Sequence, residues 1–219
     1  EYSDIDIFIM VSDCDAVEYY QIKNDFSKQL NIPMDWISLY RNSKIYDMID
    51  YGSYFLWHIK LEGVKIYDLE NRLENSLNNL QPYQKAKEDI LEYEMIYKDI
   101  QKSLKEDSLT IDYELNLLAS IIRNTAIAIA YMNDEYLFDR YQPVKYCIYN
   151  FSKYLHFDLN EYKELYNYRI NYNRNNVSET KKNNLIAYSL IWLDHTNDIL
   201  CVAKNIIESR GEGYGLLWY

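Results

Sequence analysis

Apolar β-branched residues recur at every second position near the start of the chain. Ile5, Ile7, Ile9 and Val11 follow this spacing, with Asp4, Asp6, Phe8 and Met10 between them. Successive side chains of a β-strand point to opposite faces, so this period is typical of a strand with one face toward a core. We predict a strand over this stretch.

The pattern then changes to a helix and back to a strand. A helix is expected over about residues 15 to 30, where Ser12 and Asp13 can turn the chain and cap it, and Pro33 ends it. The stretch MDWISLY, residues 34 to 40, is rich in β-forming residues and predicts a second strand.

A further helix and strand complete the first 70 residues. The apolar positions after Asn42 follow a helical period as far as Gly63, where we expect the helix to end. The next stretch, VKIYD, predicts a short third strand. Strands alternating with helices favour an α/β sheet unit over residues 1–70.

From residue 71 onward the period is helical throughout. The pattern predicts five helices, at about residues 82–106, 111–132, 143–155, 159–174 and 178–208. Short links between them favour an antiparallel bundle over residues 71–219. The fold class is therefore α+β: an N-terminal mixed sheet with helices, then a C-terminal helical bundle.

Composition narrows the class of protein. Hydrophobic residues make up 48% of the 219 and charged residues 26%, which is typical of a globular chain. No apolar run approaches the roughly 20 residues that span a bilayer, so no membrane partner is expected. Three widely spaced cysteines suggest neither a disulfide framework nor a zinc site, and a cytoplasmic setting is expected. A net charge of −11 disfavours nucleic acid as a partner.

Two carboxylates at the head of the first strand give the clearest chemical signal. Asp4 and Asp6 are two residues apart, so they project from the same face of a strand. Two like charges so close repel each other, and a divalent cation with a preference for oxygen ligands removes that repulsion. A solvated acidic strand end is the commoner reason for a bare Asp-x-Asp, and it stays open as the alternative.

A third carboxylate shifts the balance toward a metal. Asp35 lies at the start of the second predicted strand, which is expected to neighbour the first. Three carboxylates from adjacent strands are able to hold two metal ions. A polar residue at a strand start is the alternative for Asp35, and Asp47 and Asp50 on the next helix are the candidates that would replace it.

These segments resemble the polymerase-β-like nucleotidyltransferase superfamily. SDIDIFIM, MDWISLY and YFLWHIKLEGVKIYD are most similar to its minimal and kanamycin-nucleotidyltransferase-like bacterial members. The resemblance covers residues 1–70 and implies that Asp4, Asp6 and Asp35 bind Mg²⁺ or Mn²⁺ and are catalytic. It also assigns Ser3 to nucleotide binding. The helical remainder is similar to the second domain of such enzymes in architecture alone.

The resemblance implies transfer of a nucleoside monophosphate from a nucleoside triphosphate, with ATP expected, to a hydroxyl acceptor. The acceptor would be a small molecule such as an aminoglycoside, or a protein, and a homodimer is left open. The family's Gly-Ser loop, which grips the triphosphate, has no counterpart before Ser3. We expect that segment to precede Glu1 in a longer chain. The alternative function is a non-catalytic, degenerate transferase that binds a protein partner, as an antitoxin does.

Other candidate sites carry less weight. His58 and Glu62 have the i,i+4 spacing of a metal pair but lack the second histidine of a zinc motif. Arg123 is a lone cation in an apolar helix, where a buried salt bridge is the commoner role and a phosphate or substrate acid the alternative. The glycine-rich stretch RGEGYG near the end fits a tail better than a phosphate loop, because no strand precedes it.

Overall fold

The computed structural model describes residues 7–106, 110–173 and 182–211. The chain divides into two compact units, unit 1 with residues 1–84 and unit 2 with residues 85–219. Within the described residues the fold is α+β and mostly helical, with nine α-helices and a sheet of two parallel strands. The predicted α+β class is confirmed at this level.

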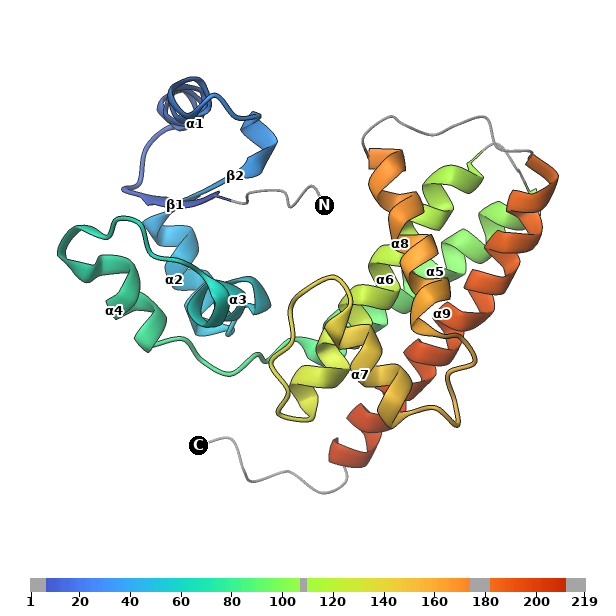
Figure 1. The fold of residues 1–219 in the computed structure, drawn as a ribbon. Coiled ribbons are helices and arrows are strands. Elements are labelled where there is room, and N and C mark those ends of the chain that lie inside the picture. The colour runs from blue at the N-terminus through green and yellow to red at the C-terminus, as the bar shows by residue number, and fades with distance from the viewer. Residues whose placement is uncertain (1–6, 107–109, 174–181, 212–219) are drawn as a thin grey trace. The chain divides into compact units, whose positions relative to one another are not determined.

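Unit 1 opens with a strand, a helix and a second strand. β1 (Ile7–Val11) pairs in parallel with β2 (Ile37–Arg41), and α1 (Ala16–Leu30) connects them. Figure 1 shows α1 over one face of the pair and α2 (Asn42–Asp50) against the other. The first strand and first helix of the sequence analysis are confirmed.

Both ends of α1 have clear stop signals. Asp15 caps the start, because its carboxylate accepts hydrogen bonds from the backbone N–H groups of Val17 and Glu18 at 2.8 and 2.9 Å. Asn31 ends the helix in the left-handed conformation, with φ of 53°. The capping role expected of Asp13 is therefore wrong by two residues, and Asp13 has a different partner.

The second predicted strand begins later than its sequence suggested. Residues Met34–Trp36 form a single 3-10 turn, closed by a hydrogen bond from the Trp36 N–H to the Pro33 carbonyl at 3.2 Å. β2 starts at Ile37. Because proline fixes its own φ and favours the first position of a turn, a β-rich stretch directly after it starts as a turn.

The single helix predicted from Asn42 to Gly63 is two helices. α2 ends at Asp50, and α3 (Tyr54–Glu62) begins after a sharp turn at Gly52, whose φ is +73°. A positive φ strains residues with a Cβ, and this glycine interrupts a helical pattern that otherwise continues. Gly63 ends α3 as expected.

The third predicted strand is wrong. Residues 64–68 form no strand, and the next helix is α4 (Arg72–Asn78), which the sequence analysis missed. Val64 and Ile66 are 88% and 92% exposed, so these β-forming residues contact little of unit 1. Asp68 instead caps α4, accepting hydrogen bonds from the N–H groups of Leu73 and Glu74 at 3.0 Å each.

The core of unit 1 lies between the strand pair and the helices after it. Phe8 and Met10 of β1 and Tyr40 of β2 pack against this core, so the opposite faces of the strands meet α1. The rings of Phe8, Tyr40 and Phe55 contact one another, with centroids 5.4–5.8 Å apart. The buried members of the cluster are Ile45, Met48, Ile49, Leu56, Leu77 and Leu80.

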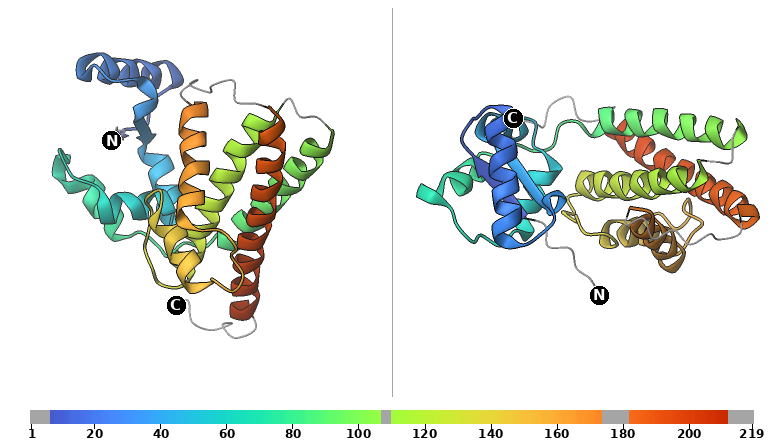
Figure 2. Two further views of the ribbon diagram at one scale, coloured as in Figure 1. Left: turned by 45° about the vertical axis from the view of Figure 1, so that its right-hand side comes forward. Right: turned by 90° about the horizontal axis from the view of Figure 1, so that it is seen from above.

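Unit 2 is a helical bundle with α6 at its centre. Its helices are α5 (Ala86–Glu106), α6 (Ile111–Met132), α7 (Gln142–Asn150), α8 (Leu159–Asn173) and α9 (Lys182–Gly211). α6 packs against the other four (Figure 2). All five predicted helices are present, although residues 174–181 lie outside the described part. The chain passes from one unit to the other between Gln84 and Lys85, so α4 belongs to unit 1. The sequence predicted this change between about residues 68 and 82, with the domains divided after residue 70.

α6 is long and apolar enough to cross a bilayer by length and composition, although no uninterrupted apolar run of the chain suggested this. Its most apolar stretch is 72% buried by neighbouring residues. Such a helix is weak evidence for a membrane span, because the buried core helix of a bundle has the same length and composition.

Candidate functional site

Of the predicted metal ligands, Asp35 alone lies in the described residues. It occupies the middle of the 3-10 turn before β2, and its side chain is exposed. Ser3, Asp4 and Asp6 lie outside the described residues. The assignment of these four residues therefore stays a prediction, with the position of Asp35 added to it.

The pairing of β1 with β2 bears directly on that assignment. Ile7 lies opposite Ile37, and the register continues to Val11 opposite Arg41. Because the strands are parallel, the segments before Ile7 and before Ile37 enter the sheet at the same edge. The neighbouring strands that a shared carboxylate site requires are thus present.

The opposite edge of the sheet holds a second polar group of residues. Asp13 follows β1, and its Oδ1 accepts hydrogen bonds from the Ser43 N–H at 3.1 Å and the Ser43 hydroxyl at 2.6 Å. These bonds from Ser43 lower the pKa of the Asp13 carboxyl below its ordinary value. They also fix the end of β1 to the first turn of α2, which gives Asp13 a structural role.

Arg41 ends β2 at this same edge. Its guanidinium lies over the ring of Tyr19, 5.1 Å from the centroid, and the Tyr19 hydroxyl donates to the Leu39 carbonyl at 2.6 Å. The contact joins α1 to β2 by a cation–π interaction. The edge is thus held together by side chains from three elements.

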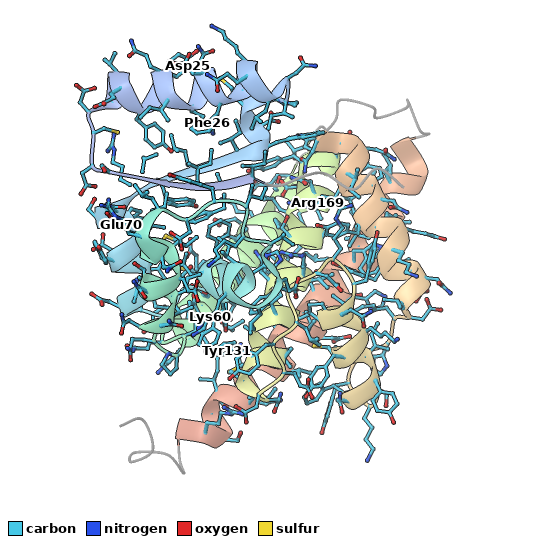
Figure 3. All side chains as sticks on the ribbon, turned by 60° about the vertical axis from the view of Figure 1, so that its left-hand side comes forward. Asp25, Phe26, Lys60, Glu70, Tyr131 and Arg169 are labelled. Atoms are coloured by element: carbon cyan, nitrogen blue, oxygen red, sulfur yellow. The ribbon has the colours of Figure 1, made fainter. Side chains whose placement is uncertain are left out.

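Figure 3 shows residues nearer the C-terminal end of α1, with Phe26 toward the strands and Asp25 away from them.

His58 and Glu62 contact each other as their spacing predicts. The His58 Nε2 and Glu62 Oε2 atoms are 3.1 Å apart, and both side chains are 43% exposed. Across residues 7–106, 110–173 and 182–211 no three His, Cys, Asp or Glu side chains are grouped to hold a metal ion. The pair therefore has the geometry of a surface contact on α3 and lacks a third ligand among these residues.

Asp47 and Asp50 on α2, the candidates that would replace Asp35, differ in their surroundings. Asp47 is exposed, whereas Asp50 lines a shallow hollow of about 440 Å³ between α2 and α4. Arg72 also lines this hollow and pairs with Glu70 at 2.9 Å. Neither aspartate belongs to a group of three His, Cys, Asp or Glu side chains among the described residues.

The salt bridge expected for Arg123 is not what the structure shows. Its Nε donates to the Asp139 backbone carbonyl at 3.3 Å, and an Nη atom donates to the Phe138 carbonyl. These acceptors are neutral, so the guanidinium anchors the segment after α6 through backbone carbonyls alone among these bonds. A cation that is buried normally has an acid partner, and none of the described carboxylates pairs with the half-buried Arg123.

A second arginine near this position was missed by the sequence analysis. Arg169 on α8 lies between that helix and α6 (Figure 3), and its Nε donates to the Ser120 hydroxyl at 2.9 Å. Its guanidinium also lies over the Tyr166 ring, 5.3 Å from the centroid. The only signal in the sequence is an arginine three residues after a tyrosine in a helix, which is too common to single out.

Comparison of the chain with protein-family models, with curated proteins and with solved structures finds no match.

Proposed function

We propose that this chain is a metal-dependent nucleotidyltransferase. It would transfer a nucleoside monophosphate from a nucleoside triphosphate, with ATP expected, to a hydroxyl group of a small molecule or a protein, with release of pyrophosphate. The observation that supports this most is the parallel pairing of β1 with β2, with Ile7 opposite Ile37. It brings the segment that follows Asp6 and the segment that follows Asp35 together at one edge of the sheet.

Chain connectivity limits how far apart the acidic residues are. Consecutive Cα atoms are about 3.8 Å apart, so Asp6 lies within one such step of Ile7. Asp35 is two residues before Ile37, and paired strands are about 4.8 Å apart. Carboxylates placed this way are within reach of a shared pair of metal ions, which sit about 3.5–4 Å from each other in two-metal sites.

The direction of the Asp35 side chain depends on the turn that carries it. If both strands simply continued backward, this register would put Trp36 opposite position 6 and Asp35 on the other face. The 3-10 turn Met34–Trp36 interrupts that alternation. We propose that the turn redirects the Asp35 carboxylate toward the pair formed by Asp4 and Asp6.

The residues fit a hard divalent cation by their chemistry. Aspartate oxygens are the ligands that Mg²⁺ and Mn²⁺ prefer, and the exposed Asp35 side chain has no structural hydrogen bond or ion pair to give up among the described residues. When bound, the ion would supply charge neutralisation for the triphosphate oxygens. Asp4 and Asp6 would hold it, and Asp35 would either complete the ligand set or accept the proton of the attacking hydroxyl.

Charge favours one class of acceptor over another. The chain carries a net charge of −11, which attracts a cationic acceptor such as an aminoglycoside and repels nucleic acid. A protein hydroxyl remains in the proposal as the second acceptor.

Calorimetric titration with Mg²⁺ or Mn²⁺ tests the metal assignment. The wild-type chain should bind at least one ion, and Asp6→Ala should abolish this binding because it removes one of two adjacent ligands. Asp25→Ala, an exposed carboxylate on α1, is the matched control and should bind as the wild type does. Equal binding by Asp6→Ala and the wild type would refute the assignment and favour the non-catalytic alternative.

A further inference from the structure

Two arginines of unit 2, one on α6 and one on α8, lie near each other in the fold. Arg169 donates from its Nε to the Ser120 hydroxyl at 2.9 Å. Ser120 is three residues before Arg123 on α6, and residues so spaced lie on the same side of a helix with Cβ atoms about 5–6 Å apart. Arg123 therefore projects from the same side of α6 as the residue that Arg169 contacts.

Neither charge is cancelled by an acid of the described residues. Arg123 donates to backbone carbonyls and weakly to Asn124 Oδ1 at 3.5 Å, and Arg169 donates to the hydroxyls of Ser120 and Tyr166. No described Asp or Glu forms an ion pair with either arginine. Both side chains are half-buried, where two like charges repel each other more strongly than in water. These two positive charges lie together in a chain whose net charge is −11.

Tyrosines complete the arrangement. Arg169 Nη1 donates to the Tyr166 hydroxyl at 3.3 Å. Tyr162 is buried and donates to the Arg140 carbonyl at 3.3 Å. Burial raises the pKa of Tyr162, while the charges of Arg123 and Arg169 act to lower it, so both guanidiniums are near this one ring. We name Ser120, Arg123, Tyr162, Tyr166 and Arg169 the arginine seam.

We propose that the arginine seam binds a phosphate group, either free phosphate or the phosphoryl group of a nucleotide. Two uncancelled guanidiniums offer planar, charged donors that match phosphate oxygens two at a time. Arg169 has an Nη2 group that donates to no described residue, so it retains donors for a ligand. A carboxylate, with two oxygens, would use fewer of these donors. This inference concerns unit 2 and does not rest on the proposed transferase activity.

Calorimetric titration of the full chain tests this proposal. The titrations use inorganic phosphate, AMP, adenosine and acetate, in EDTA and in a buffer free of phosphate and sulfate. EDTA keeps any metal-dependent nucleotide binding in unit 1 out of the measurement. We expect saturable binding of phosphate and AMP, and no binding of adenosine or acetate at the same concentrations. Tighter binding of AMP than of phosphate identifies a nucleotide as the source, and equal binding identifies the phosphate group alone.

Variants locate the site. Arg169→Gln should weaken phosphate binding at least about tenfold, because it removes a charged donor. Arg169→Lys keeps the charge without the fork and should bind with intermediate affinity. Arg72→Gln makes the same change at a paired surface arginine of unit 1 and should bind as the wild type does. The wild-type titration decides the matter even if a variant does not fold. The proposal is overturned if phosphate shows no saturable binding up to about 10 mM, because a Kd above this concentration corresponds to only a few kcal/mol of binding free energy. Acetate binding as tight as phosphate, or equal binding by Arg169→Gln, also overturns it.

Discussion

Gly52→Ala is expected to destabilise unit 1 by about 3 kcal/mol or more, by two effects that add. The φ of +73° at Gly52 costs an L-residue about 1–2 kcal/mol. An added Cβ would also lie 2.3 Å from the carbonyl oxygens of Gln81 and Pro82. To relieve that clash, the segment 81–84 has to move away from the turn.

That movement has a cost of its own. The Gln81 N–H donates to the Ile49 carbonyl, and the Gln84 N–H donates to the Tyr51 carbonyl, each at 3.1 Å. The Trp57 indole N–H donates to the Gln81 carbonyl at 3.1 Å. Losing these bonds removes about 0.5–1.5 kcal/mol each. The segment that leads into unit 2 therefore depends on the absence of a side chain at Gly52.

Thermal and urea unfolding, with hydrogen exchange read separately over unit 1 and unit 2, measures the effect. For a unit of this size 3 kcal/mol corresponds to a fall in melting temperature of about 12–24 °C. Exchange in unit 2 should change little. Gly52→Asn separates the two causes, because asparagine tolerates a positive φ but still carries a Cβ. A Gly52→Asn variant as stable as the wild type would show that the clash with Gln81 and Pro82 does not matter.

Asp35→Asn is expected to lower turnover at least about a hundredfold, the scale of losing a general base or a metal-ligand charge. The change keeps the shape of the side chain and removes its charge. Because Asp35 is exposed and forms no hydrogen bond with the described residues, the melting temperature should stay within about 2 °C of the wild type, as for ordinary surface changes. A catalytic role thus separates cleanly from a structural one.

Two further variants make the result specific to Asp35. Asp47→Asn and Asp50→Asn remove a charge from the neighbouring helix α2, and both should retain wild-type turnover. Full activity of Asp35→Asn, with loss in one of these two, would move the third carboxylate to α2. Loss of both turnover and stability in Asp35→Asn would mean that the side chain supports the 3-10 turn instead.

The helices of unit 2 could be predicted because each is long and strongly periodic. α6 and α5 end within a few residues of their predicted bounds, since many positions contribute to the period of a long helix. Unit 1 was harder. α2 and α3 form one continuous helical pattern, and only the turn at Gly52 separates them. An isolated glycine in a helical pattern does not by itself reveal a positive φ.

The failed strand at residues 64–68 shows the limit of β propensity. Val64 and Ile66 have the residue types of a strand, but propensity measures how well a side chain suits a pleated, half-buried surface. In unit 1 no described strand pairs with them, and both remain exposed. Asp68 is engaged instead by the start of α4, so the local hydrogen bonds favour a helix cap at this point.

The arginine seam could be predicted only in part. Arg123 attracted attention because it is a cation in an apolar helix. Its neighbour Arg169 comes from a distant helix, and only the packing of α8 on α6 brings the two together. The candidate site of unit 1, in contrast, was predicted from the sequence first. Its residues come from short stretches that the sequence made conspicuous, and the structure adds the parallel pairing of the strands behind them.

We propose that Asp4, Asp6 and Asp35 support transfer of a nucleoside monophosphate. The most direct test incubates the full chain with Mg²⁺ and ATP labelled at the α- or the γ-phosphate, in parallel, with pools of aminoglycosides and of proteins. We expect acceptor labelling from the α-phosphate, release of the γ-label as pyrophosphate, and no labelling by Asp6→Asn. Acceptor labelling from the γ-phosphate, or α-labelling that Asp6→Asn leaves unchanged, would contradict this proposal.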